Sequence, residues 1–399
     1  MNFHESEERR ALREAVAALG ATYGHEYWRE AARSGTHTTD LWEEAGRLGY
    51  LGVAVPEAYG GGGGGIADLA AVCEELATAG CPLLLMVVSP AICATVIARY
   101  GTDEQRAGWL PRFADGSVTM AFAITEPDAG SNSHRLATVA RREAAGERGH
   151  ERGHGWHLTG RKTYISGVDA ADAVLVVART ADARTGRLKP VLCVVPTDAP
   201  GFTCNPIPME IASPERQFEL VLDDVPLPAD ALVGGEDAGL AALFAGLNPE
   251  RIMAASYSLG IARYALDRAA AYARTRTVWD VPIGAHQGLA HPLAAAAVDV
   301  ELARLMTQKA AWLHDEGETA DGASDATGEA ANMAKYAAAE AAVAAVDQAV
   351  QVHGGNGLAT EYGLGSLVAA VRLARIAPVS REMVLNFVAQ HTLGLPRSY

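Results

Sequence analysis

Cysteine is scarce in this chain: only five occur among 399 residues, and they are scattered along it. Their number is odd and no two form a Cys-x-x-Cys pair, so neither a disulfide framework nor a cysteine-based zinc site is indicated. We therefore expect a reduced, cytoplasmic protein without a metal site. The cysteines are Cys73, Cys81, Cys93, Cys193 and Cys204.

Basic charge and long apolar runs are also in short supply. Lysine and arginine number 33 against 48 acidic residues, giving a formal net charge of −15. A nucleic-acid-binding protein usually presents a basic face, so that class is disfavoured. The longest uncharged run, Gly80 to Ala98, is interrupted by Pro82 and Pro90, which predicts a buried helix and no membrane span. Residues 1–16 are charged and amphipathic, unlike a signal peptide.

The pattern along the chain changes character twice. A length of 399 residues is enough for two or three domains. Residues 1–118 carry helical patterns, residues 119–232 carry short β-type runs separated by turn residues, and residues 233–399 are helical again. This order predicts an α+β fold with an N-terminal helical domain, a middle β domain and a C-terminal helical bundle.

Two stretches could suggest a ligand site by composition alone. Six glycines, Gly60 to Gly65, lack the preceding strand and the GK[ST] ending of a phosphate-binding loop, so a flexible loop is expected. His150 and His154 lie between two predicted strands among glycines and arginines. That composition favours a solvated hairpin loop over a metal site.

Three motifs indicate chemistry in combination. They are AFAITEPDAGSN (Ala121 to Asn132), KTYISG (Lys162 to Gly167) and QVHGGNG (Gln351 to Gly357). Each is weak alone, because glycine-rich turns are common. Together with the PEAYGG loop and the stretch ARTRTVWDVPIGAHQG, in this order and spacing, they resemble the acyl-CoA dehydrogenase family over nearly the whole chain.

The resemblance implies a C-terminal four-helix bundle, FAD as cofactor, an acyl-CoA substrate, and assembly as a homotetramer. Electron-transfer flavoprotein is the partner expected for the family. The residues implied to line the flavin ring are Thr125, Ser131, Tyr164 and Ser166, with Ser380 also assigned to the cofactor. Those implied to hold the adenine and pyrophosphate, typically from a neighbouring subunit, are Arg276, Gln287, Gln351, Gly354 and Gly355.

Two residues depart from the family pattern beside this second set. Trp279 stands where phenylalanine is usual, and Asp280 stands where glycine is usual. An acid at that place could disturb the pyrophosphate, which prefers arginine and close backbone approach.

The family reaction needs a carboxylate that takes the α proton of the acyl chain while the flavin accepts a hydride from the β carbon. Most members carry this glutamate in a C-terminal YEGT motif. Here the matching stretch is IAPVS, and Pro378 cannot act as a base; the usual preceding Arg-Asp pair is replaced by Ala369 and Ala370. In the isovaleryl-CoA and long-chain types the glutamate lies on an earlier helix, directly before an arginine. NPERIMAAS matches that pattern, so we predict that Glu250, before Arg251, is the base.

A structural role for Glu250 competes with this assignment. Asn248 is a good N-cap, Pro249 a good first helical residue, and an acid next complements the helix dipole of a helix over 251–276. The dipole would lower the pKa of Glu250, so the bound acyl chain would have to raise it. Because the C-terminal glutamate is missing, we favour catalysis. The poorer candidates are Glu126, Glu361 and Glu382.

The neighbours of Glu250 have expected roles as well. Arg251 is expected to form an ion pair across domains, with contact to CoA or FAD as the second choice. Asn248 matches a family position that contacts the pantetheine arm, and Ser131 is placed in the substrate set too. In relatives the thioester oxygen accepts a hydrogen bond from the amide of the C-terminal glutamate, which Pro378 lacks. The amide of Ala377 or Val379 is expected to replace it.

Four functions stay open on the sequence. The first is α,β-dehydrogenation of an acyl-CoA thioester, with a preference for short or branched chains. The second is a dehydrogenase or oxidase acting on an acyl carrier protein in secondary metabolism. The others are a flavin monooxygenase and a non-catalytic acyl-CoA-binding homologue, both on the same fold.

Overall fold

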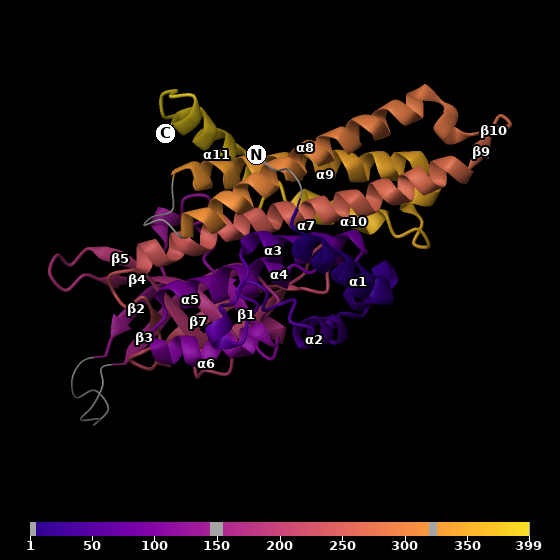
Figure 1. The fold of residues 1–399 in the computed structure, drawn as a ribbon. Helices are drawn as coiled ribbons and strands as arrows, with labels where there is room; N and C mark the ends of the chain where they lie inside the picture. The colour runs from indigo at the N-terminus through magenta and orange to yellow at the C-terminus, as the bar shows by residue number, and fades with distance from the viewer. Residues whose placement is uncertain (1–4, 144–154, 319–324, 399) are drawn as a thin grey trace.

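The computed structural model describes residues 5–143, 155–318 and 325–398. Helices come first, then strands, then helices, as the sequence pattern predicts. Three long C-terminal helices lie side by side above the N-terminal helices and the sheet (Figure 1). His150 and His154 lie outside the described residues, and the strands on either side of them pair as an antiparallel hairpin.

The N-terminal helices pack around a buried, proline-interrupted centre. Gly80 to Ala98 forms short helical pieces around a π-helical turn, η2 (Ser89–Ala94), whose residues are all buried. This confirms the predicted buried helix, and within the described residues no helix is long and apolar enough to cross a membrane. The helices are α1 (Glu7–Ser34), α2 (Thr39–Arg47), α3 (Ile66–Thr78), α4 (Leu85–Val88), α5 (Thr95–Tyr100) and α6 (Asp103–Ala114).

The glycine run Gly60 to Gly65 is held in place by backbone hydrogen bonds, so the expectation of a flexible loop is wrong. The amides of Gly61, Gly62, Gly63 and Gly64 donate to carbonyls within residues 52–56 at 2.9–3.3 Å. A Cβ at Gly61 would lie 2.1 Å from the Val55 carbonyl oxygen. Glycine is therefore required here because two backbone segments meet directly.

The middle domain is one twisted sheet with the strand order β6-β7-β3-β2-β4-β5-β8, and β1 pairs with β4. The valine-rich β4 is buried on both faces, which explains its continuous apolar sequence. The sequence pattern missed β2 and β8, which are short. The strands are β1 (Met120–Ala123), β2 (Val139–Arg142), β3 (Trp156–Ser166), β4 (Ala173–Ala181), β5 (Leu188–Pro196), β6 (Phe202–Ile207), β7 (Gln217–Leu227) and β8 (Leu232–Val233).

The first C-terminal helix, α7, corrects the predicted helix start. It begins at Gly239, so Asn248 is not an N-cap and Pro249 lies inside the helix. Glu250 is therefore a mid-helix residue, beyond the reach of the dipole at the first turn. The other elements are the hairpin strands β9 (Thr277–Val278) and β10 (Val281–Pro282), then α8 (Gln287–Glu318), α9 (Asp325–His353), α10 (Gly365–Leu373) and α11 (Arg381–Phe387).

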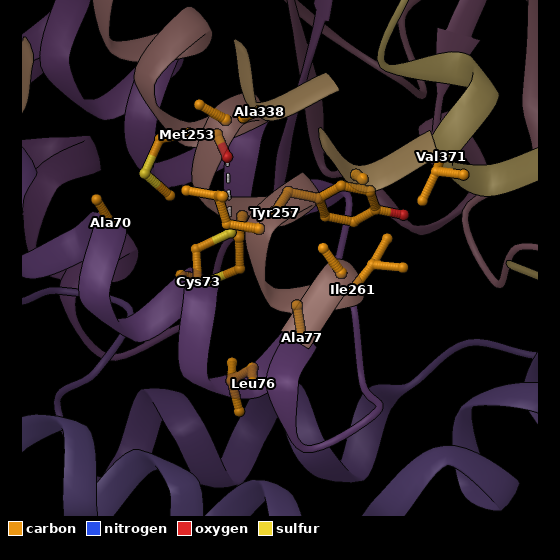
Figure 2. Close-up of a cluster of buried hydrophobic side chains, with 14 of the residues drawn as sticks. Ala70, Cys73, Leu76, Ala77, Met253, Tyr257, Ile261, Ala338 and Val371 are labelled. Carbon is orange, nitrogen blue, oxygen red and sulfur yellow. Dashed lines mark hydrogen bonds between the residues drawn. The ribbon is translucent and has the colours of Figure 1, made fainter. Parts of the chain in front are cut away.

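A buried cluster fixes α7 directly after Glu250. Side chains of α3, α7, α9 and α10 meet around Tyr257 (Figure 2). The Cys73 thiol of α3 lies 3.9 Å from the Met253 carbonyl of α7, to which it donates. The part of α7 directly after Glu250 is thus held against three other helices by close packing.

Candidate active site

The structure brings the first two motifs together. The amide of Thr163 donates to the Thr125 carbonyl at 3.0 Å, and the Lys162 ammonium donates to the Ile124 carbonyl at 3.0 Å. Lys162 is fully buried and also pairs with Glu126 at 2.9 Å. The turn after β1 and the end of β3 therefore form one rigid surface.

Glu126 is a structural centre of this surface and a poor candidate for a base. Its carboxylate accepts hydrogen bonds from the amides of Ala137 (2.5 Å) and Thr138 (3.0 Å) besides its bond from Lys162. Burial alone would raise the pKa of Glu126, but these three donors lower it below its ordinary value. A carboxylate held charged and fully bonded does not accept a proton from a substrate.

Tyr164 and Ser166 lie where β3 deviates from regular pairing. The register between β3 and β7 shifts between Lys162 and Ile165, and Tyr164 adopts a positive φ of 57°. Its side chain is 59% exposed, while the Ser166 hydroxyl bonds the Gln217 side chain. Such a bulge re-aims a side chain, and here it presents an aromatic face suited to stacking on a planar ring. Ser131, in the turn after β1, is exposed.

Glu250 has the environment expected of a general base. Burial raises its pKa from 4.5 to about 7, against the lowering influence of the Arg251 and Lys335 charges. The side chain is partly accessible, yet protein atoms crowd the carboxylate enough for burial to dominate. Among the described residues none donates a hydrogen bond to it, so it is free to face a ligand. The expectation that the bound substrate must raise this pKa is therefore wrong: the protein alone does so.

Cys93 of η2 is bonded to β1 and also lies within the electrostatic influence of Glu250. The Cys93 thiol donates to the Met120 and Ala121 carbonyls of β1 at 3.7 Å. Burial raises the pKa of Cys93 far above its usual range, and the nearby Glu250 charge adds to this. Since β1 leads directly to Thr125, Glu250 and the first motif share one region of the molecule.

The IAPVS segment reaches the same region through Lys335. The Lys335 ammonium donates a hydrogen bond to the Val379 carbonyl, and its charge acts on Glu250. The Ala377 amide donates to the Leu373 carbonyl at 2.9 Å. Of the two amides expected to replace the one lost at Pro378, Val379 is therefore the one without a partner in the described chain.

Arg251 forms no ion pair across domains with the residues that the structure describes, contrary to expectation. Its Nη1 donates to the Leu247 carbonyl (3.1 Å) and to Asn248 Oδ1 (3.2 Å), both on its own helix. Its Nε is buried without a hydrogen-bond partner in the part of the chain that is described. The other acids are poorer than Glu250, since Glu361 and Glu382 are exposed. Ser380 accepts a bond from the Met383 amide as the N-cap of α11.

The residues assigned to adenine and pyrophosphate lie far from Glu250. Arg276 follows Glu250 by 26 positions, which is about 39 Å along a helix. All are exposed, at the end of the bundle that carries β9 and β10 (Figure 1). Within one chain, the residues that the resemblance assigns to the adenine and pyrophosphate therefore lie far from Glu250 and the first motif. This set is Arg276, Gln287, Gln351, Gly354 and Gly355.

Sequence profiles for three domains match this chain in the order of its three parts. The acyl-CoA dehydrogenase N-terminal domain matches residues 6–117, the middle domain residues 121–225, and the C-terminal domain residues 237–393. The chain belongs to the acyl-CoA dehydrogenase family. The fold class expected from the sequence is thereby confirmed, with N-terminal helical, middle β-sheet and C-terminal helical domains.

Relatives of this acyl-CoA dehydrogenase family member match it over the full length. Acyl-CoA dehydrogenase FadE12 of Mycobacterium tuberculosis is 63% identical over 398 residues, covering 100% of this chain and 99% of the relative. Butyryl-CoA dehydrogenase of Megasphaera elsdenii has a TM-score of 0.89 at 27% identity, covering 98% and 100% of the two chains. Glutaryl-CoA dehydrogenase of Mycobacterium smegmatis, in complex with FADH2, has a TM-score of 0.87 at 28% identity, covering 99% and 96%.

The adenine-side residues of this family member fit a flavin dinucleotide. Gly354 has a positive φ of 58°, and open space lies where a Cβ of Gly354 or Gly355 would point. Arg276 is exposed and forms no ion pair with any described residue. Backbone that can be approached closely and an uncommitted guanidinium are what a diphosphate needs.

Proposed function

We propose that this protein catalyses the FAD-dependent α,β-dehydrogenation of an acyl-CoA thioester to the trans-2-enoyl-CoA, with Glu250 as the base. The observation that carries this proposal is a carboxylate that receives no hydrogen bond from the described residues and whose pKa is raised to about 7 by burial. General bases work best when their pKa lies near the working pH. Pro378 occupies the alternative position and offers no base.

Glu250 removes the α proton of the acyl chain while the thioester carbonyl gains negative charge. FAD, when bound, supplies the acceptor for the hydride that leaves the β carbon. The free amide of Val379 is the donor that we assign to the thioester oxygen, and one such donor contributes roughly 3 kcal/mol. The charges of Arg251 and Lys335 favour the ionised form of Glu250, so a useful fraction is ready to accept the proton near neutral pH.

The flavin ring is assigned to the surface formed by the first two motifs, with Tyr164 presenting its exposed face beside Thr125. The adenine-side residues are assigned to a second copy of the chain, since they lie at the end of the helical bundle away from Glu250, at the end of α7, the start of α8 and the end of α9. An exposed apolar stripe on α8 supports a homotetramer, because such stripes are usually covered by another subunit. Its members are Val298, Leu302, Leu305 and Trp312.

The substrate is assigned to CoA thioesters with short or branched acyl chains, oxidised in the cytoplasm with electron-transfer flavoprotein as acceptor. Asn248 Oδ1 accepts a bond from Arg251, which leaves the Nδ2 donor for the pantetheine arm. An anaerobic panel of acyl-CoAs tests this assignment by bleaching of the flavin. Later reaction with air distinguishes an oxidase, and the absence of bleaching with every acyl-CoA would favour the carrier-protein, monooxygenase or binding alternatives.

The decisive variant is Glu250→Gln, tested beside the matched control Glu382→Gln. Glu250→Gln should keep FAD and acyl-CoA binding but slow flavin reduction at least about a hundredfold, within the range for general bases. Glu382→Gln, which alters an exposed carboxylate of the neighbouring segment, should stay within a few-fold of the unaltered protein. Rapid reduction in Glu250→Gln would refute the assignment.

A further inference from the structure

Lys335 is a buried cation to which the family resemblance assigns no role. It lies on α9 and is 2% exposed, among the largest fully buried side chains. Its ammonium donates to the Val379 carbonyl, in the segment that contains Pro378. Burying a charged amine costs several kcal/mol unless its surroundings compensate. The groups that face it should therefore show what the charge is for.

Four charged groups act on Lys335, from three helices. They are Glu250 and Arg251 on α7, Glu340 on α9 and Glu382 on α11. Glu340 is already compensated, because it pairs with Arg375 and, at 3.0 Å, with Arg381. Glu382 is exposed, so water screens its charge.

Glu250 is the remaining anion, and it lacks a partner of its own. No described residue forms a hydrogen bond or ion pair with it, and the cations acting on it are Arg251 and Lys335. Arg251 Nη1 donates its hydrogen bonds within its own helix, to the Leu247 carbonyl and to Asn248 Oδ1. Lys335 is thus the cation that connects Glu250 to the Pro378 segment.

We propose that Lys335 is a positioning residue, which holds Val379 at the active site by its hydrogen bond and favours the carboxylate form of Glu250 by its charge. The proposal rests on Glu250 being the base. It gives a function to a buried lysine at a position where an apolar side chain would avoid the free-energy cost of burying a charge. It also explains how the segment around Pro378 keeps a defined place without the glutamate of other family members.

The sign of the pH effect follows from the two charges. Without a positive charge at position 335 the pKa of Glu250 rises above about 7, so less carboxylate is present at neutral pH. The rate of flavin reduction then falls near pH 7 and recovers at higher pH. Burial lowers the pKa of Lys335 itself to about 8, so the unaltered protein loses this advantage above that pH. The two profiles should converge there.

Three variants of the FAD-bound protein separate charge from hydrogen bonding. Lys335→Arg keeps both, Lys335→Gln keeps a donor for the Val379 carbonyl but no charge, and Lys335→Met keeps neither. Anaerobic flavin reduction is measured against pH in each. Difference infrared spectra of the Glu250 carboxyl, with Glu250→Gln as reference, give its protonation without turnover.

We expect the acid limb of the profile and the infrared titration to move up by about one pH unit in Lys335→Gln and Lys335→Met. Lys335→Arg should leave both in place. Lys335→Met should also raise KM, because Val379 loses its anchor. Flavin content and the thermal midpoint are recorded to show that each variant is folded. If Lys335→Met does not fold, Lys335→Gln alone tests the effect of the charge.

Two results would overturn the role of Lys335. One is an acid limb and infrared titration unchanged in Lys335→Gln; the other is a rate loss equal at every pH, which indicates packing alone. The failure of the underlying base assignment looks different. In that case Glu250→Gln reduces its flavin at the normal rate, whatever the Lys335 variants do.

Discussion

At the scale of single residues, Glu250 binds its proton more tightly in the folded chain than in the unfolded one, because burial raises its pKa from 4.5 to about 7. Between these values the folded state holds more protons, so stability falls as pH rises through this window. Glu250→Gln removes this dependence. The variant should be more stable than the unaltered protein above pH 7 by about 3 kcal/mol.

Thermal unfolding of both proteins at about pH 5 and about pH 8 measures this difference. The glutamine variant should have the higher midpoint at the upper pH, with the advantage much reduced at the lower pH. A gap of constant size at both values would mean that Glu250 carries no raised pKa. This prediction follows from a general trade-off: a group that is needed for activity can lower the stability of the folded protein.

Pro378 provides a second prediction at this scale. If the Val379 amide bonds the thioester oxygen, the amide gained in Pro378→Ala is redundant, and flavin reduction should stay within a few-fold of the unaltered rate. Stopped-flow reduction under anaerobic conditions measures it. An acceleration of tenfold or more would show instead that the native site lacks that donor, since one donor contributes roughly 3 kcal/mol.

Sequence reasoning singled out Glu250 but gave no reason to consider Lys335, and both outcomes have physical causes. Glu250 has a local signature, the following Arg251, and its importance is raised by the missing glutamate at Pro378. Lys335 stands in an alanine-rich helical stretch where a lysine ordinarily faces solvent. Lys335 is instead buried, and its hydrogen bond to Val379, 44 positions away, is a tertiary contact that no local pattern reveals.

At the scale of elements, the start of α7 shows where local signals lose to packing. The sequence Asn-Pro-Glu is a strong helix start, yet α7 begins at Gly239. Residues 239–247 are mostly apolar, and α7 packs along this part against η2 and β5. Tertiary contacts therefore extend the helix through Pro249 and change the environment of Glu250 from a helix end to a helix interior.

In the hairpin of β9 and β10, the departure from the family pattern at Trp279 and Asp280 has a physical consequence, which is backbone strain. Its two turn residues, Trp279 and Asp280, have φ values of 55° and 63°. Glycine is usual at the second position because positive φ strains other residues by roughly 1 kcal/mol. The turn closes beside Arg276, whose carbonyl accepts a bond from the Ile283 amide at 2.8 Å.

Asp280→Gly should relieve this strain and remove an acid near the expected pyrophosphate. We expect FAD to bind about fivefold more tightly, corresponding to about 1 kcal/mol. Asp280→Asn is the matched variant, since asparagine loses the charge but relieves less of the strain. Equal gains in both would assign the effect to charge; a gain in neither, by fluorescence titration of the apoprotein with FAD, would contradict the prediction.

At the scale of the whole molecule, the order of helices and strands was enough to predict the fold, because each part has its own hydrophobic period. The sequence pattern does not show in the same way that the proposed cofactor site is shared between two chains. Only the length of α7 shows that Arg276 and Glu250 of one chain lie about 39 Å apart. The proposed cofactor site therefore combines two chains, and its existence depends on assembly.

Arg276→Ala should lose FAD and weaken assembly together, while the control Arg274→Ala, an exposed arginine of the same helix end, should do neither. Mixing provides the sharper measurement. Arg276→Ala and Glu250→Gln chains are each inactive, but a mixed pair contains one site with both native residues. Random re-assembly should restore about a quarter of the native rate. If the site lay within one chain, every mixed pair would stay inactive, and a monomer with fully bound FAD would contradict the shared site directly.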